Sequence, residues 1–209
     1  MTGIVSYGAY VPLRRLGQGT QGWNPATGKA VANWDEDSLT MAVAAAIDCL
    51  GDIDRGTVDG LYFATTTPPY GEKLAATTAA WATDLRKDIL TADITDSLRA
   101  GTTALRMAAD TVKAGSAKQV LVTASDLRMG AANLDNGFGD GAASLLIGDE
   151  NVIATIEASY SVSNELLDVW RASGVQNTRS WEDRFVFEQG YMKILPAAVT
   201  AFLEQNGLT

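Results

Sequence analysis

An apolar strand, a turn of small residues and a helix follow one another within residues 93–115, and this segment constrains the fold more than any other part of the chain. Four apolar residues share one face of the expected helix: Leu105, Ala108, Ala109 and Val112. Gly115 stands where a left-handed C-terminal cap is expected. The turn, residues 97–101, would lie against the unpaired N–H groups and the positive dipole end of the helix, which favour an anion or a nucleophile. The segment is typical of the site-bearing turn of an α/β enzyme.

The rest of the chain continues this alternation of strands and helices. Strands are expected at residues 3–11, 58–66, 89–95, 118–125 and 142–147, and helices at about 38–50, 73–85 and 191–206. This order predicts βαβ crossovers and a mostly parallel sheet covered by helices on both faces. The Gly-rich stretch 14–34 has little periodicity and is interpreted as a long loop.

The charge balance excludes several kinds of partner. Sixteen Lys and Arg against 25 Asp and Glu give a formal charge of −9, without any basic run. Neither a nucleic acid nor an anionic membrane surface is therefore expected as a partner. The N-terminus lacks a basic segment followed by an apolar one, and no 18-residue apolar run occurs, so we expect a cytoplasmic protein without a membrane anchor.

Cysteine and histidine usage narrows the chemistry further. Cys49 is the single cysteine and lies on the apolar side of the helix at 38–50, so it is interpreted as a buried hydrophobe, and no disulfide within the chain can form. The chain has no histidine, which removes the commonest general base and the commonest metal ligand. We expect no metal or cofactor to be bound by this chain.

The turn at Ala100-Gly101-Thr102 resembles the nucleophile turn of the thiolase superfamily, in its hydroxymethylglutaryl-CoA synthase-like branch, which reads Cys, any residue, Ala, Gly or Ala, Thr. In this alignment Leu98 occupies the cysteine position and Arg99 the variable one. Leucine has no nucleophilic atom, so the acyl-enzyme that the resemblance implies cannot form there. The neighbouring Ser97 is interpreted as a turn-stabilising hydroxyl, with a nucleophile as the alternative.

Two further segments carry the same resemblance. The strand that ends in Thr65-Thr66-Thr67 and precedes Pro68-Pro69-Tyr70 places Thr66 where the resemblance implies a catalytic glutamate, and a threonine hydroxyl has no pKa near neutrality. The run Gly139-Asp140-Gly141-Ala-Ala matches a signature of the superfamily, in which Asp140 is interpreted as structural, between glycines that allow a sharp turn. The candidate pocket residues are Thr66, Ser97, Leu98, Arg99, Gly101 and Asp140, and none is assigned as catalytic.

The resemblance also implies the domain organisation. Residues 1–160 would form the first βαβαβαββ half of a thiolase-like fold, and residues 161–209 a connecting excursion and the first helix of an incomplete second half. In the superfamily, the second half supplies a histidine and an asparagine that polarise the thioester carbonyl. The chain is therefore expected to be either a truncated piece or one subunit of a split enzyme.

Partners are implied in the same way. The expected strand at 89–95 corresponds to one that pairs with its two-fold copy in thiolase-like dimers, and the apolar residues of helix 191–206 would need a partner surface. The resemblance implies a homo- or hetero-oligomer, a separate second-half chain, and a zinc-ribbon/OB-fold acyl-CoA-binding protein.

A retained scaffold with a lost nucleophile predicts a subunit that acts at a carbon–carbon bond of a CoA thioester without an acyl-cysteine, for example in an aldol or retro-aldol step on a β-hydroxyacyl-CoA. The alternative is a non-catalytic scaffold that presents an acyl-CoA to an active thiolase-like subunit. A third hypothesis is a synthase that uses Ser97.

Because Leu98 stands at the thiolate position, incubation with acetyl-CoA or acetoacetyl-CoA is expected to leave the intact mass of the protein unchanged. Mass spectrometry of the intact chain and of its peptides measures this directly. A stable acetyl adduct mapped to Ser97 or Cys49 would contradict the prediction.

Overall fold

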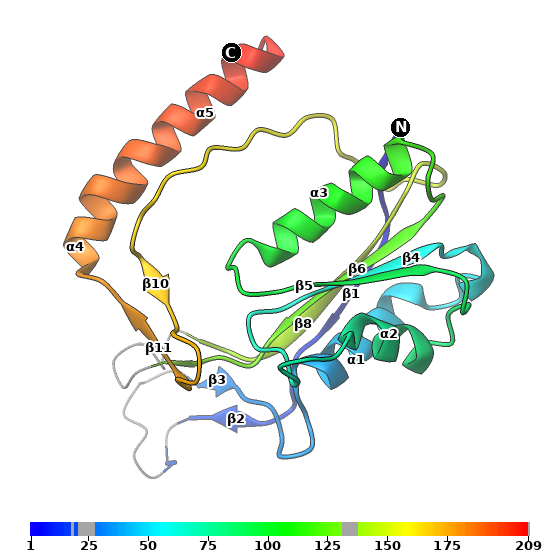
Figure 1. Cartoon of the computed structure of the whole chain (residues 1–209), viewed down its shortest axis with the longest axis horizontal. Helices are drawn as coiled ribbons and strands as arrows, with labels where there is room; N and C mark the ends of the chain where they lie inside the picture. The colour runs from blue at the N-terminus through cyan, green and yellow to red at the C-terminus, as the bar shows by residue number, and fades with distance from the viewer. Residues whose placement is uncertain (18, 21–27, 131–137, 209) are drawn as a thin grey trace. The chain divides into compact units, whose positions relative to one another are not determined.

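A computed structural model describes residues 1–17, 19–20, 28–130 and 138–208 (Figure 1). The chain forms two compact units. The first consists of Met1–Arg128 and Phe138–Ile156, and the second of Met129–Gly137 and Glu157–Thr209. The boundary near residue 160 was predicted for the two halves of a complete thiolase-like fold, and it stays a prediction.

The first unit is a six-stranded sheet with helices on both faces. Its elements are β1 (Gly3–Tyr10), β2 (Arg15–Leu16), β3 (Lys29–Ala30), α1 (Ser38–Leu50), a short 3-10 helix (Arg55–Thr57), β4 (Gly60–Ala64), α2 (Ala75–Ala82), β5 (Leu90–Ile94), α3 (Ala100–Lys113), β6 (Val120–Asp126), β8 (Gly141–Gly148) and β9 (Ala154–Thr155). The strand order is β5-β4-β6-β8-β1-β9. The predicted α/β architecture is confirmed.

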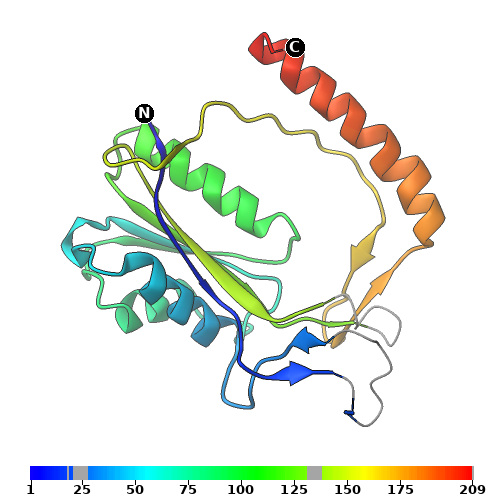
Figure 2. The same ribbon diagram turned by 180° about the vertical axis from the view of Figure 1, so that it is seen from behind.

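The sheet is mixed. β4 pairs in parallel with β5 and β6, whereas β8 runs antiparallel to both β6 and β1, beside which it lies in Figure 2. Four strands, β5, β4, β6 and β1, therefore point the same way, and β8 and β9 point the opposite way. As a result the carboxyl ends of β4 and β6 meet the beginning of β8 at one edge of the sheet.

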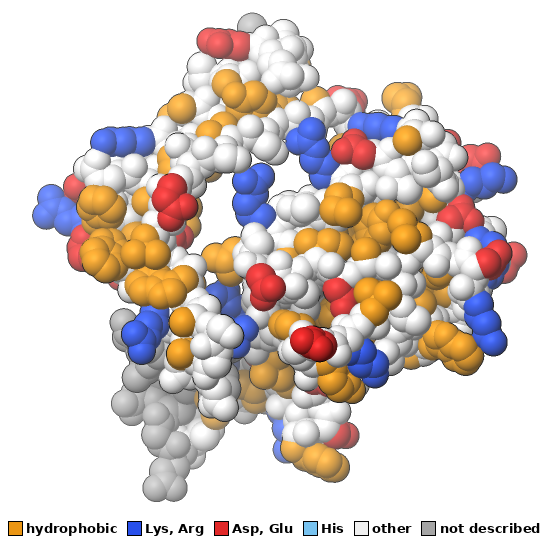
Figure 3. Space-filling view, in the orientation of Figure 1, with side chains coloured by type: hydrophobic (Ala, Val, Ile, Leu, Met, Phe, Trp, Pro, Cys, Tyr) orange, Lys and Arg blue, Asp and Glu red, His pale blue; other side chains and the backbone are white. Residues whose placement is uncertain are grey.

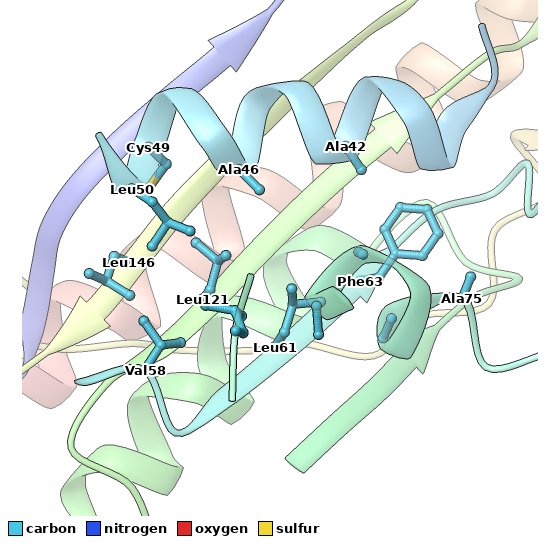
Figure 4. Packing of buried hydrophobic residues seen from close by; sticks show 14 of the residues in the cluster. Ala42, Ala46, Cys49, Leu50, Val58, Leu61, Phe63, Ala75, Leu121 and Leu146 are labelled. Carbon is cyan, nitrogen blue, oxygen red and sulfur yellow. The ribbon is translucent and has the colours of Figure 1, made fainter. Parts of the chain in front are cut away.

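Alternate residues of the central strands pack into two separate hydrophobic clusters, one on each face of the sheet. Leu61, Phe63 and Leu121 face α1 and α2, and Figure 4 shows them beneath Ala42 and Ala46 of α1. On the other face, Tyr62 and Val122 are among the residues packed with α3. This period of two is what a strand buried on both faces requires.

Helix α1 is bounded by residues of the types that commonly begin and end helices, Asp37 and Gly51. The Asp37 carboxylate accepts a hydrogen bond from Thr40 N–H at 2.7 Å, and Asp37 N–H donates to Thr40 Oγ1 at 2.7 Å, which is a capping box. Gly51 ends the helix with φ of +42°. Ile47 lies outside the buried face of the helix and is 49% exposed.

Helix α2 is shorter than the predicted 73–85. Its N-terminal residue carries no side-chain cap, and Asp93 of the neighbouring β5 caps it instead, accepting hydrogen bonds from two backbone N–H groups of the first turn at 2.7 Å each. Asp84, with φ of +57°, lies beyond the helical region and turns the chain toward β5. A carboxylate on a strand thus fixes where this helix begins.

The predicted loop at 14–34 contains regular structure. β2 and β3 pair antiparallel, with Arg15 opposite Ala30 and Leu16 opposite Lys29. Part of the predicted loop, residues 18 and 21–27, lies outside the described residues. The expectation of a loop without regular structure was therefore wrong for residues 15–16 and 29–30. These residues pair through their backbones, which requires no periodic pattern of apolar side chains in the sequence.

The second unit holds β7 (Met129–Gly130), β10 (Val169–Trp170), β11 (Asn177–Ser180), α4 (Asp183–Phe185), a π-helical turn (Val186–Tyr191) and α5 (Met192–Asn206), with strand order β10-β11-β7. The helix predicted at 191–206 is present as α5, but the helical run begins earlier, at Asp183, where the Glu182 carboxylate accepts hydrogen bonds from two backbone N–H groups.

No residue of α5 is buried, and Leu195 and Val199 are more than half exposed. Hydrophobic side chains gather over α4 and the first turns of α5 in Figure 3, where Phe185 and Met192 are also exposed. Among the described residues, no helix has both the length and the apolar character needed to cross a membrane.

The contact between α1 and β1 generates a stability prediction. A Cβ added at Gly8 would lie 2.2 Å from Cys49 N and 2.5 Å from Ala45 O, both backbone atoms of α1. Gly8→Ala is therefore expected to lower the free energy of unfolding by about 3 kcal/mol, at the upper end of the usual cost of over-packing. Gly71→Ala is the matched control, since nothing lies within 4 Å of its added Cβ. Urea unfolding measures both, and equal changes would contradict the prediction.

Candidate functional site

A cavity of about 430 Å³ opens where β4 and β6 end, β8 begins and α3 starts. Its lining residues are mostly small, with four hydroxyl side chains and two charged ones: Ala64, Thr65, Thr66, Ser97, Leu98, Ala100, Gly101, Ala124, Ser125, Asp126, Arg128, Gly141, Ala142 and Ala143. Ligands of α/β sheets bind outside the carboxyl ends of the parallel strands, and this volume lies in the range of small-molecule sites.

The N-terminus of α3 forms one wall of the cavity. The predicted turn 97–101 ends earlier than expected, because Ala100 and Gly101 already belong to the helix. Arg99 is the N-cap residue, and its side chain accepts no hydrogen bond from the first turn. A cationic side chain is also unfavourable beside the positive end of the helix dipole. Ala100 N–H donates to the Ser97 carbonyl and Thr103 N–H to the Arg99 carbonyl, so Gly101 and Thr102 supply the N–H groups for an anionic or strongly polarised oxygen of a ligand.

Ser97 stabilises the turn before α3. Its Oγ accepts a hydrogen bond from Arg99 N–H at 3.1 Å, and its carbonyl oxygen accepts one from Ala100 N–H at 2.9 Å. With a single cysteine in the sequence and no histidine, no imidazole of this chain can activate the hydroxyl. The geometry favours the interpretation of Ser97 as a turn-stabilising residue.

Asp126, at the end of β6, is the cavity residue that sequence reasoning missed. Its Oδ1 accepts hydrogen bonds from Thr66 N–H at 2.6 Å, Thr66 Oγ1 at 3.0 Å, Thr65 Oγ1 at 3.1 Å and Thr67 Oγ1 at 3.3 Å. The Thr67 hydroxyl oxygen in turn accepts from Leu127 N–H at 3.0 Å. One carboxylate oxygen thus joins the ends of two parallel strands.

The position of Asp126 at the end of the apolar strand β6 could have identified it as a cavity residue. A carboxylate directly after the buried run of β6 must lie at the sheet edge where Thr66 also lies, because β4 and β6 are parallel neighbours. The sequence alone did not establish that these two strands are neighbours, so the two residues, 60 positions apart, were not connected.

Arg128 supplies the positive charge on the cavity wall. Its guanidinium carbon lies 4.6 Å from the centroid of the Phe138 ring, in a cation–π contact that joins the chain on either side of residues 131–137. Both side chains are partly buried. No periodic or motif signal in the sequence points to this pair, which depends on where the two chain segments meet.

The six candidate residues divide between the cavity and its surroundings. Thr66, Ser97, Leu98 and Gly101 line the cavity. Arg99 occupies the N-cap position of α3 and lies outside the cavity lining. Asp140 also lies outside the lining, where its Oδ2 accepts a hydrogen bond from the N–H of Ala32 at 2.8 Å, and it thereby holds the segment after β3.

Nothing in the described part of the chain assembles three or more His, Cys, Asp or Glu side chains into a metal site. Burial raises the pKa of the Cys49 thiol, which lies in the core between α1 and the sheet, away from the cavity lining. The thiol is therefore held in its neutral, unreactive form.

Known proteins share this architecture. No family model matches the chain. The sequence is 32% identical to the hydroxymethylglutaryl-CoA synthase of Methanocaldococcus jannaschii over 99% of this chain and 64% of that protein, and 32% identical to the one of Pyrococcus horikoshii over 99% and 62%. The chain thus spans somewhat less than two thirds of the length of these curated relatives.

Solved structures match the whole chain. An HMG-CoA synthase complexed with CoA superimposes with a TM-score of 0.87 at 17% identity, over 100% of this chain and 57% of that one. A 3-oxoacyl-(acyl-carrier-protein) synthase III matches with a TM-score of 0.77 at 17% identity, over 100% and 75%. The chain has a thiolase-like fold, and its sequence is similar to those of hydroxymethylglutaryl-CoA synthases. The resemblance first noted at Ala100-Gly101-Thr102 is confirmed.

The two positions at which the resemblance implies catalytic groups lie on the same cavity. Leu98 is 56% exposed at the turn before α3, and Thr66 donates hydrogen bonds to Asp126 from its backbone and from its side chain. Where the resemblance implies a thiol and a carboxylate, the cavity therefore presents an apolar side chain and a hydroxyl already used in the strand-end cluster.

The hydrogen bonds of Asp126 generate the next prediction. Asp126→Ala leaves the Thr65, Thr66 and Thr67 donors without their acceptor and is expected to lower the free energy of unfolding by about 2–3 kcal/mol. Asp110→Ala, an exposed carboxylate on α3, is expected to change it by less than about 0.5 kcal/mol. Urea denaturation of the two variants side by side checks this, and a loss at Asp126 no larger than that at Asp110 would refute it.

Proposed function

We propose that this thiolase-like chain acts on a CoA thioester at a carbon–carbon bond without a covalent acyl-enzyme, as in an aldol or retro-aldol step on a β-hydroxyacyl-CoA. The observation that carries the proposal is the cavity itself. It keeps the helix N-terminus and the polar strand ends of a thiolase-like site, while Leu98 stands at the thiolate position. Chemistry that needs an oxyanion site but no nucleophile fits such a cavity.

The N-terminus of α3 would serve the thioester oxygen. When the carbon–carbon bond of a β-hydroxyacyl-CoA breaks, its electron pair moves onto the α-carbon, and negative charge collects on the thioester oxygen as an enolate. Uncapped N–H groups and the helix dipole stabilise that charge more than they stabilise the neutral thioester. The first turn of α3, at Ala100 and Gly101, lines the cavity where this oxygen would lie.

Asp126 is the proposed general base. Its carboxylate would take the proton of the β-hydroxyl as the carbonyl of the leaving aldehyde or ketone forms, and the enolate would then be reprotonated at carbon to give the shortened acyl-CoA. The threonine donors on Oδ1 fix the direction of the carboxyl group. In the reverse direction the same groups would form the bond.

The complete site would need other chains. The second half of the fold, a homo- or hetero-oligomeric assembly, and a zinc-ribbon/OB-fold acyl-CoA-binding protein belong to this proposal, as does a cytoplasmic location. Support for an assembly comes from β5, an edge strand whose first residue, Leu90, is 60% exposed, and from the exposed apolar residues of α5. Exposed strand edges are normally paired or protected.

A non-catalytic scaffold is the second candidate function. It is favoured by the saturation of Asp126 Oδ1 with four hydrogen bonds, which suits a carboxylate that holds strands together. In that case the cavity would bind an acyl-CoA without converting it, for the benefit of an active thiolase-like subunit.

Activity distinguishes the two. The isolated 209-residue chain is expected to show no acyl-CoA condensation or cleavage above background, and activity is expected only after co-expression with the flanking reading frames that complete the fold. In the completed complex, Asp126→Asn should lower kcat about 10²–10⁴-fold, the usual contribution of an acid/base group. Release of free CoA or of a shortened acyl-CoA, followed by chromatography, measures the reaction.

Asp110→Asn is the matched control, because this carboxylate lies on the exposed side of α3, outside the cavity lining. Turnover by the isolated chain would overturn the requirement for a second chain. A completed complex that binds acyl-CoA but converts none would replace the enzyme by the scaffold.

A further inference from the structure

Leu98 places a large apolar side chain on the wall of the cavity, where it is 56% exposed. Among the described residues that line the cavity, the other apolar side chains are all single methyl groups, those of Ala64, Ala100, Ala124, Ala142 and Ala143. Covering exposed apolar surface is favourable roughly in proportion to the area removed from water. The wall at Leu98 therefore favours an apolar group of a ligand.

The turn that carries Leu98 is fixed by the residue before it. Ser97 Oγ accepts a hydrogen bond from Arg99 N–H at 3.1 Å, and the Ser97 carbonyl oxygen accepts one from Ala100 N–H at 2.9 Å. The backbone of Leu98 cannot move away from the cavity without breaking these bonds. A surface that is already in place requires less ordering when a ligand packs against it.

The polar groups of the cavity determine which part of a substrate would meet Leu98. In the proposed reaction, N–H groups at the start of α3 hold the thioester oxygen, and Asp126 takes the proton of the β-hydroxyl. The α-carbon of the acyl group lies between these two reacting groups. Leu98 stands two residues before the first residue of α3 and lines the same cavity, so its side chain would lie nearest to the α-carbon.

Space remains beside this side chain. The cavity volume of about 430 Å³ is empty with Leu98 in place, so the leucine narrows the cavity without filling it. The side of the β-carbon is polar, because the hydroxyl residues Thr65 and Thr66 stand there with Asp126. An apolar substituent therefore fits at the α-carbon and not at the β-carbon.

We infer that Leu98 determines specificity for an acyl-CoA that carries an alkyl branch on its α-carbon. The inference rests on the proposed function, because that function places the thioester at the start of α3. The broken bond joins the α- and β-carbons, so the branch stays on the shortened acyl-CoA. Leu98 selects the substrate by apolar contact and exchanges neither a proton nor an electron pair with it.

Two isomeric acyl-CoA probes test this inference. Butyryl-CoA and isobutyryl-CoA contain the same atoms and differ in whether the last carbon extends the chain or branches at the α-carbon. Neither has a β-hydroxyl to start the cleavage, so their Kd values can be measured by calorimetry on the full protein with any chain that co-purifies with it. Isobutyryl-CoA is expected to bind about tenfold tighter, a usual effect of one methyl group in an apolar pocket. Leu98→Ala should abolish that preference, and Leu98→Met should keep part of it.

Leu13→Ala is the control, since Leu13 is 92% exposed and lies outside the cavity lining, and it should leave the preference unchanged. Equal affinity of the native protein for the two isomers overturns the inference. So does an equal loss of affinity for isobutyryl-CoA and for free CoA in Leu98→Ala, because Leu98 would then pack against the CoA arm.

The S-ethyl thioesters of isobutyric and butyric acid separate this inference from the proposed function. If neither acyl-CoA binds, the proposed function fails. The two small thioesters can still be titrated against protein with ¹³C-labelled leucine methyl groups, in which the Leu98 signals are those missing from Leu98→Ala. A larger shift of these signals with the branched thioester supports an alkyl subsite on its own. Equal shifts with the two thioesters, or none, overturn it.

Discussion

The site depends on one carboxylate, Asp126, which joins two parallel strands where their backbone pairing ends. Beyond the last residue of β4, Thr65 N–H still pairs with the Ile94 carbonyl of β5, but Thr66 N–H and the threonine hydroxyls have no partner in the sheet, and leaving such donors buried without an acceptor is costly. Thr66 N–H and the hydroxyls of Thr65, Thr66 and Thr67 donate to Asp126 Oδ1. Because this cluster fixes both strand ends, it also fixes the cavity wall that they form with α3.

Small residues determine how closely α1 and α2 pack against the sheet. α1 packs so tightly on β1 that a side chain at Gly8 would enter the helix backbone, and alanines make up three of the eight buried residues of α1 and all four of α2. Such close packing gives many dispersion contacts. A helix held at this distance cannot shift without moving the strand, so the sheet edge that bears the cavity is rigidly supported.

Local signals made most of the fold predictable, and distant contacts made most of the site unpredictable. The ends of α1 could be inferred because Asp37 and Gly51 lie next to the helix they terminate. The start of α2 could not, since its cap is Asp93, 18 residues further on. Asp126 and Arg128 could not be identified for the same reason, since their contacts depend on strand order and on where two segments meet. Leu98, in contrast, was identified from contiguous residues.

The cavity shows which parts of a thiolase-like site depend on side chains and which depend on the backbone. A leucine at the position where the resemblance implies a thiol cannot form an acyl-enzyme, but the N–H groups of α3 and their dipole belong to the main chain and do not depend on the residue that precedes them. Electrostatic stabilisation of an enolate needs those groups, and not the thiol. Asp126 and Arg128 line the same cavity as the first turn of α3, so a carboxylate and a cation lie near these N–H groups, which suits the proposed step that moves a proton and an electron pair without attaching the substrate to the protein.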